Sequence, residues 1–162
     1  MTSLLFLSEK AQAFLRDLGL LGLRLWAAQE FLLAGWSKLS AGTSAPEWFK
    51  GLDFPFPNDL LGPQLNWLAA GSGEVVLGLM LLLGWKSRFA ALGLIYITCV
   101  AIYTVHFDLG WAGWRAIETD AGQGFKVPLM LGLMLFAVLT QGPGQYSVDA
   151  CAGRSSIQKQ PE

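Results

Sequence analysis

Ionisable side chains stand inside stretches of the chain that are otherwise apolar, and these are the residues whose types could do chemistry: Arg24, Glu30, Lys38, Glu74 and His106. A charged group in the centre of a bilayer costs about 2.5–3.5 kcal/mol on insertion scales, so it faces the interior of a helix bundle and has a partner. A basic group beside a carboxylate can neutralise it, hold a proton or donate to a polar ligand. These residues therefore form a candidate intramembrane polar site.

Helical spacing places these groups on particular faces. One stripe follows steps of four and three residues and contains Arg24, Ala28, Phe31, Gly35 and Lys38. A second stripe follows the same steps and contains Trp67, Gly71, Glu74 and Gly78. Small residues in both stripes let helices approach closely in lipid. We predict that the stripes face each other and that Arg24 pairs with Glu74, either to serve function or only to fix helix register.

Two of the ionisable residues lie away from these stripes. Glu30 is rotated by about 120° from the Arg24 stripe, so it is expected to face another helix or an outer vestibule. His106 is the only histidine and stands at the outer end of its apolar stretch. It can relay a proton or bind a quinone carbonyl near the interface, or it is a boundary histidine bonded to backbone or water.

Missing motifs exclude several classes of site. One histidine cannot form a bis-histidine haem site, and the chain has no Glu-x-x-His, no Cys-x-x-Cys and no Walker pattern. We therefore predict no metal site and no covalently bound cofactor, so any redox chemistry must use a diffusible cofactor, a quinone or a partner subunit. Eleven basic residues offset twelve acidic ones without clustering, which excludes a nucleic-acid binder.

The elements that must position these residues follow from composition. Of the 162 residues 53% are hydrophobic and 14% are charged, whereas soluble domains carry about 25% charged residues. Stretches of around 20 apolar residues cross a bilayer as helices. The fold class predicted is all-α, an integral membrane four-helix bundle in one transmembrane domain, 18–141. Its expected spans are about 18–39, 63–83, 89–107 and 124–141.

The flanking segments set the expected topology. Residues 1–17 form an N-terminal segment that lies along the membrane interface or stacks on the bundle, and residues 142–162 form a polar tail expected to lack regular structure beyond Asp149. Four spans put both termini on one side. Basic residues are six on the side of the termini and the 84–88 turn against four in the two long connections, which favours cytoplasmic termini.

The outer connections are the expected meeting place for partners. Both are long and rich in aromatic residues, and Trp111 and Trp114 lie near the outer boundary, as in an aromatic belt. We predict that these two tryptophans contact a partner.

An ordered set of motifs over residues 18–149 resembles the DoxX-type membrane proteins, the group that includes the small subunits of thiosulfate:quinone oxidoreductase. The matching residues are Gly22-x-Arg24-Leu25, Phe31, Gly35, Trp36, Lys38, Leu39, Gly73-Glu74, Gly78, Leu82-Leu83-Gly84, Arg88, Gly142-Pro143-Gly144 and Ser147-Val148-Asp149. The resemblance implies a four-helix bundle in the bacterial inner membrane with a redox-linked role beside other proteins. Its Arg, Glu and Lys positions transfer to Arg24, Glu74 and Lys38. The long outer segment 106–126 departs from the pattern.

Three functions remain open. The chain is a redox subunit that binds a quinone near Arg24, Glu74 and His106 while a partner carries the electrons. Alternatively it is a non-catalytic membrane anchor or assembly factor for a periplasmic or membrane enzyme. The third function, a small-molecule carrier, is less favoured because four spans show no internal symmetry. Expected partners are the lipid bilayer and either other protein subunits or further copies of this chain.

Overall fold

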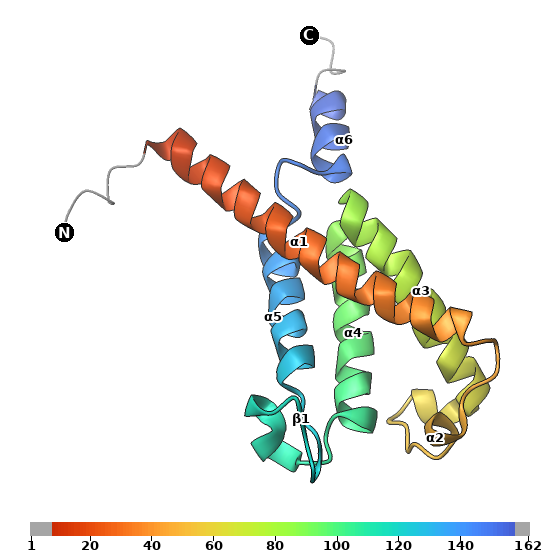
Figure 1. Cartoon of the computed structure of the whole chain (residues 1–162). Helices are drawn as coiled ribbons and strands as arrows, with labels where there is room; N and C mark the ends of the chain where they lie inside the picture. Colours follow the sequence, from red (N-terminus) through yellow and green to blue (C-terminus); the bar gives the residue numbers. More distant parts are fainter. Residues whose placement is uncertain (1–7, 158–162) are drawn as a thin grey trace.

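The computed structural model describes residues 8–157, and helices dominate it (Figure 1). The long helices are α1 (Glu9–Ser40), α3 (Pro63–Leu83), α4 (Ser87–Val105) and α5 (Lys126–Gln141). The shorter elements are α2 (Glu47–Lys50), η2 (Asn58–Leu60), η3 (Gly110–Arg115), β1 (Glu118–Thr119), β2 (Gly122–Gln123) and α6 (Val148–Ile157). The start of α1 and the helix α6 lie at one end of the molecule, and α2 and the β1–β2 hairpin lie at the other.

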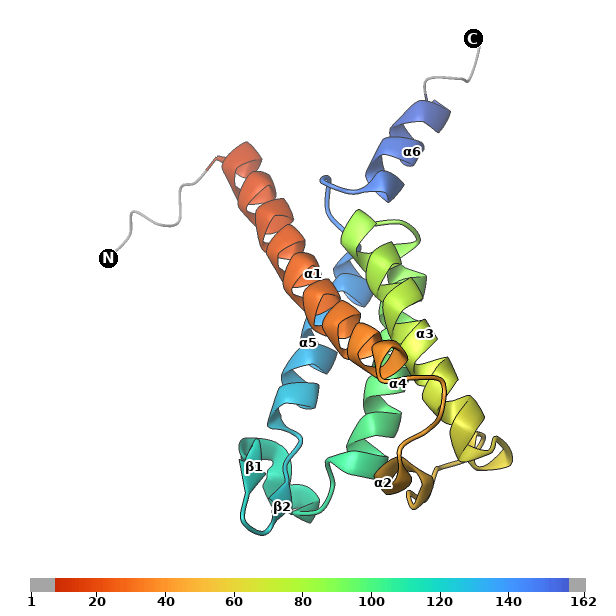
Figure 2. The same cartoon turned by 45° about the vertical axis from the view of Figure 1, so that its right-hand side comes forward.

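Helix α1 is one uninterrupted helix of 32 residues, about 48 Å at 1.5 Å per residue. Ser8 caps it by accepting a hydrogen bond from the backbone N–H of Ala11 at 3.4 Å, and Lys38 stands in its last turn, where a cation suits the helix dipole. The helix lies obliquely across its neighbours (Figures 1 and 2). Of the predicted interfacial segment, residues 1–7 lie outside the described part, and from Glu9 onward the segment continues into α1.

Helices α3 and α4 form an antiparallel pair joined by a tight turn. Pro63 occupies the first turn of α3, where its missing N–H costs nothing, and Gly84 ends the helix in the left-handed conformation with φ 69°. Within the described residues these two helices are long and apolar enough to cross a membrane by length and composition, and α5 is a shorter apolar helix.

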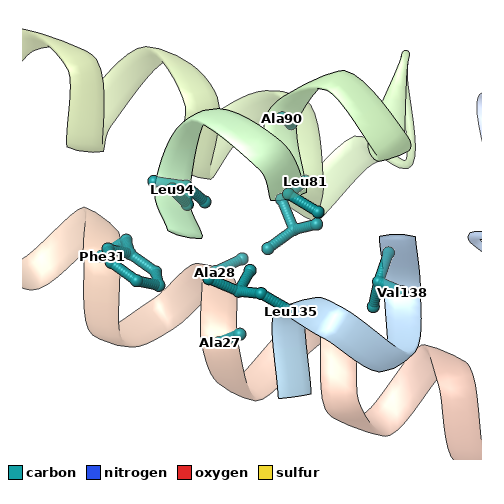
Figure 3. Packing of buried hydrophobic residues seen from close by; sticks show 9 residues of the cluster. Ala27, Ala28, Phe31, Leu81, Ala90, Leu94, Leu135 and Val138 are labelled. Carbon is teal, nitrogen blue, oxygen red and sulfur yellow. The ribbon is translucent and has the colours of Figure 1, made fainter. Parts of the chain in front are cut away.

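The core lies where the four long helices meet. Figure 3 shows Ala27, Ala28 and Phe31 of α1 packed against side chains of the other three helices, and the buried partners are Leu81, Ala90, Ala91, Leu94, Leu135 and Val138. The alanines of α1 and α4 let the helix backbones approach closely. Large apolar side chains such as Leu33, Phe89 and Leu133 instead point outward and are more than half exposed, which suits helices whose solvent is lipid.

Two compact connections, residues 41–62 and 106–125, close the end of the molecule away from α6. The first connection folds back on α3, where Phe49 and Trp67 pack edge to face at 5.0 Å and the backbone N–H of Ala45 donates to Gln64 at 2.9 Å. The second connection forms η3 and the β1–β2 hairpin, tied by Asp108, which accepts from the backbone N–H of Gln123 at 3.0 Å.

The tail is more ordered than its composition predicts. The expectation of no regular structure beyond Asp149 is wrong, because α6 runs from Val148 to Ile157. Its start is held to the bundle by Asp149, whose backbone N–H donates to the carbonyl of Gly84 at 3.0 Å.

Candidate functional site

The central ion pair of the molecule joins Lys38 on α1 to Glu74 on α3. Lys38 Nζ lies 2.7 Å from Glu74 Oε2 and 3.0 Å from Oε1, and the Glu74 side chain is only 8% exposed. An added Cβ at Gly35 would lie 2.7 Å from the carbonyl oxygen of Gly71 and 2.9 Å from the Cβ of Glu74. The two small-residue stripes therefore face each other as predicted, and this close approach brings lysine and glutamate together.

Arg24 does not pair with Glu74, so that prediction is wrong. Its guanidinium donates from Nη1 to the carbonyl of Pro143 and from Nη2 to the carbonyl of Tyr146, both at 2.7 Å. Arg24 is 2% exposed and lies against Gly84, at the end of α3. It binds the connection between α5 and α6 to the bundle, and Asp149 follows this connection in the first turn of α6.

The predicted Arg24–Glu74 pair does not form because of the register of α1 on α3. Gly35 lies opposite Gly71 and Glu74, and Arg24 lies opposite Gly84. Gly84 follows Glu74 by ten residues, about 15 Å of helix. Helical spacing predicted which faces of the two helices meet. It did not predict the axial offset between the helices, and this offset decides which group each charge meets.

Beside the Lys38–Glu74 pair lies a cavity of about 320 Å³ between α3, α4 and the connection from α1 to α3. Its walls are mostly apolar and aromatic. They comprise Trp48, Phe49, Phe54, Ala69, Ala70, Ile97, Val100, Ala101, Thr104 and Val105. Ligand pockets are typically concave, apolar and about 300–1,000 Å³, with a few placed polar groups. This cavity is the candidate site.

A network of neutral polar groups forms part of the cavity wall. Tyr96 Oη donates to Asn58 Oδ1, and Asn58 Nδ2 donates to Asn66 Oδ1 at 3.0 Å. Asn66 Nδ2 donates in turn to the backbone carbonyls of Asn58 and Leu61 at 2.8 and 3.1 Å. None of these three residues was predicted from the sequence. A signal existed for Asn66, which is a polar residue inside an apolar stretch and directly precedes Trp67 of the Glu74 stripe.

His106 also lines the cavity, one residue beyond the end of α4. Its Nδ1 is buried and has no hydrogen-bond partner among residues 8–157. Burial lowers the pKa of His106 below its usual 6.5, while Asp108 and the backbone of Gly124 act in the opposite direction. A neutral imidazole at this position can accept a proton or bond a polar ligand group.

The remaining predicted residues lie outside the cavity. Glu30 is half-buried on α1, does not line the cavity and makes no ion pair with any described residue. Trp111 and Trp114 lie on η3 and are 82% and 58% exposed, so they remain free to contact a partner. Among the described residues no group of three His, Cys, Asp or Glu side chains could hold a metal ion.

Comparison with known proteins identifies the family of this chain. The DoxX family model matches residues 19–107, which contain Arg24, Lys38, Glu74 and His106. The chain belongs to the DoxX family. The matched range ends before the segment with Trp111 and Trp114, so these two tryptophans lie outside it.

This DoxX protein is also similar to an uncharacterized protein of Haemophilus influenzae. The two are 32% identical over 142 residues, which cover 86% of this chain and 87% of the relative. No solved structure matches the chain. The comparisons therefore identify a family of membrane proteins but name no ligand and no reaction.

Proposed function

We propose that this DoxX protein crosses the bacterial inner membrane four times, binds a quinone-class ligand in the cavity beside Lys38 and Glu74, and serves as the membrane subunit of a redox system. Two helices meet the length and composition of a membrane span, and α5 is a shorter apolar helix. Six basic residues near the termini and the 84–88 turn, against four in the two long connections, support cytoplasmic termini. In this orientation the cavity opens toward the periplasmic half of the membrane.

This proposal rests on the cavity, because its lining residues suit a ligand that has an apolar ring with polar oxygens. Aromatic and aliphatic side chains in the wall suit the ring, and polar groups in the same wall suit its oxygens. Lys38 has three N–H donors, of which two go to Glu74 in the observed pair, so one remains for a ligand carbonyl. His106 supplies a second polar group, and its buried Nδ1 lacks a partner among the described residues.

The described side chains suit proton transfer rather than electron transfer. A bound quinone would supply the redox chemistry by accepting two electrons and two protons. Lys38, Glu74 and His106 can hold and pass protons at the edge of the cavity. The single histidine cannot form a bis-histidine haem site, and the two cysteines are too few for the four thiolates of an iron–sulfur cluster. We therefore assign the electron transfer to a partner protein.

Quinone binding is testable without knowing that partner. Trp48 lines the cavity, so the protein in nanodiscs should lose tryptophan fluorescence when decylubiquinone or a short-chain menaquinone is added. Ala101→Phe fills the cavity and should weaken the quenching, whereas Glu30→Gln changes a charge outside the cavity and should leave it unchanged. Equal quenching in wild type and Ala101→Phe, with saturation at the same concentration, would exclude this cavity.

The exposed tryptophans favour a second function, a membrane anchor for an enzyme outside the membrane. Trp111, Trp114 and Ile117 are each more than half exposed on one outer segment, and aromatic residues are enriched at protein interfaces. If anchoring is the function, Trp111→Ala abolishes capture of the partner and Glu74→Gln leaves the activity of the assembly unchanged. If the quinone function is correct, Glu74→Gln abolishes activity while the assembly stays intact.

A further inference from the structure

A second groove lies at the opposite end of the bundle from the candidate site. Its volume is about 850 Å³, and it is bounded by the end of α3, the start of α4 and the connection after α5. Trp85, Lys86 and Arg88 line it at the turn between α3 and α4, and Val76, Met80 and Phe89 extend it along the two helices. The groove therefore joins a basic edge to an apolar wall.

Lys86 has an unusual backbone conformation. It is the one non-glycine residue of the described chain with positive φ, at φ 46° and ψ 44°. Glycine adopts this conformation without steric cost, whereas a lysine there is strained. The Nζ of Lys86 lies 5.6 Å from the centre of the Trp85 ring. Such outliers persist at functional positions, so a basic side chain at this strained turn points to a use for its charge.

The acidic group of the groove is already engaged. Asp149 Oδ1 accepts from the backbone N–H of Lys86 at 2.7 Å, and Oδ2 accepts from the N–H and hydroxyl of Ser87 at 2.9 and 3.0 Å. Arg88 Nη2 donates to the carbonyl of Thr140 at 3.4 Å. Among residues 8–157 neither Lys86 nor Arg88 forms an ion pair. Two cations and the one carboxylate of Asp149 leave the lining of the groove with a formal net charge of +1.

The apolar wall indicates that an anionic group bound in the groove belongs to a molecule with a hydrocarbon part. Val76 and Phe89 are 56% and 64% exposed. Val76 lies nine residues before Trp85 along the chain, so the wall extends about 13 Å from the basic turn toward the middle of the helices. A free anion would use only the basic turn, whereas a phospholipid uses both parts. Basic pockets between transmembrane helices on the cytoplasmic side bind anionic lipid head groups.

We propose that this groove is a binding site for an anionic phospholipid, with the phosphate at Lys86 and Arg88 and an acyl chain along Val76, Met80 and Phe89. The site rests on the proposed membrane insertion but not on quinone binding. Trp85, 48% exposed at the turn, marks the level of the membrane interface. Lipid of this class would tie the α3–α4 turn to the connection that Arg24 holds.

The test measures lipid binding by native mass spectrometry and by the melting temperature of the full chain in detergent. Phosphatidylglycerol should bind and raise the melting temperature more than phosphatidylcholine of the same acyl chains. Inorganic phosphate at matched concentration should not raise it. Lys86→Gly with Arg88→Gln should weaken phosphatidylglycerol binding about 30-fold, since each basic residue near an anionic lipid surface contributes roughly a factor of five. Glycine keeps the left-handed turn, so the fold survives.

Arg16→Gln is the matched control, because Arg16 is an exposed cation at the same end of the molecule and does not line the groove. It should leave lipid binding unchanged. Equal binding of the two lipids, an equal effect of inorganic phosphate, or equal losses in the control and the double variant would each overturn the proposal. Quinone quenching should be unaffected by Lys86→Gly, so this proposal and the proposed function fail separately.

Discussion

The middle of α1, at Arg24, and its last turn, at Lys38, bury charge in different ways. Arg24 is held by the backbone carbonyls of Pro143 and Tyr146 and lies against Gly84, with its charge enclosed by the polypeptide. Lys38 is held by a carboxylate, and both members of that pair line a cavity. A charge bonded to backbone joins segments of the fold, whereas a charged pair beside a cavity can exchange partners with a ligand. Burial and polarity alone do not separate these two roles.

The largest effect is expected for Arg24→Leu, which tests whether Arg24 joins segments of the fold and is independent of Glu74. It removes two charge-assisted hydrogen bonds to carbonyls that then lack a donor, so the free energy of unfolding should fall by about 3–5 kcal/mol. SDS-induced unfolding in detergent measures the loss. Because Arg24 and Glu74 do not touch, Glu74→Gln should not rescue the variant, and the two effects should add. A rescue would mean that the two groups are coupled after all.

The opposite result is expected for Lys38 and Glu74. Lys38→Gln leaves a buried carboxylate without its cation and should destabilise by about 2 kcal/mol. Adding Glu74→Gln should recover part of that loss, with a coupling energy of about 1–2 kcal/mol in a double-mutant cycle. Quinone quenching should be lost in both variants. If the effects simply add, the pair does not contribute to stability as a unit.

Helix contact can be tested with matched glycines of α1. A Cβ at Gly35 would meet Gly71, Glu74 and Val75 within 2.9 Å, whereas a Cβ at Gly22 has nothing within 4 Å. Gly35→Ala should therefore cost about 1–3 kcal/mol by overpacking and should also disturb the Lys38–Glu74 pair. Gly22→Ala should be neutral or slightly stabilising. Equal melting temperatures for the two variants would contradict the close approach of α1 and α3.

The smallest expected effect concerns His106. Its folded-state pKa is lowered by burial below 6.5, so the unfolded chain binds more protons as the pH falls. The stability that the neutral imidazole contributes is complete above 6.5 and is lost as the pH falls through the folded-state pKa. The melting-temperature advantage of wild type over His106→Gln should therefore shrink between about pH 7.5 and about pH 5.5. An advantage that grows over this range would show that the charged form is preferred in the fold.

The candidate site was predictable in part. Lys38, Glu74 and His106 were identified as polar residues in apolar stretches, and all three line the cavity. Asn58 and Tyr96 were missed because their contact joins a connection to α4 across 38 residues. Arg24 was assigned to the wrong partner because its acceptors are backbone carbonyls, which any residue type supplies.

The amino-acid sequence by itself determined the helical stretches and the small-residue stripes, since these follow from local periodicity and composition. It also determined the family, through the ordered motifs that the family model matches. The tertiary structure decided the register of α1 on α3, and with it which buried charge meets a carboxylate, which meets backbone and where a cavity remains. Helical spacing specifies the face on which a side chain lies but not its height against a neighbour. That height depends on the close packing of Gly35 and Gly71 together with every other contact between the helices.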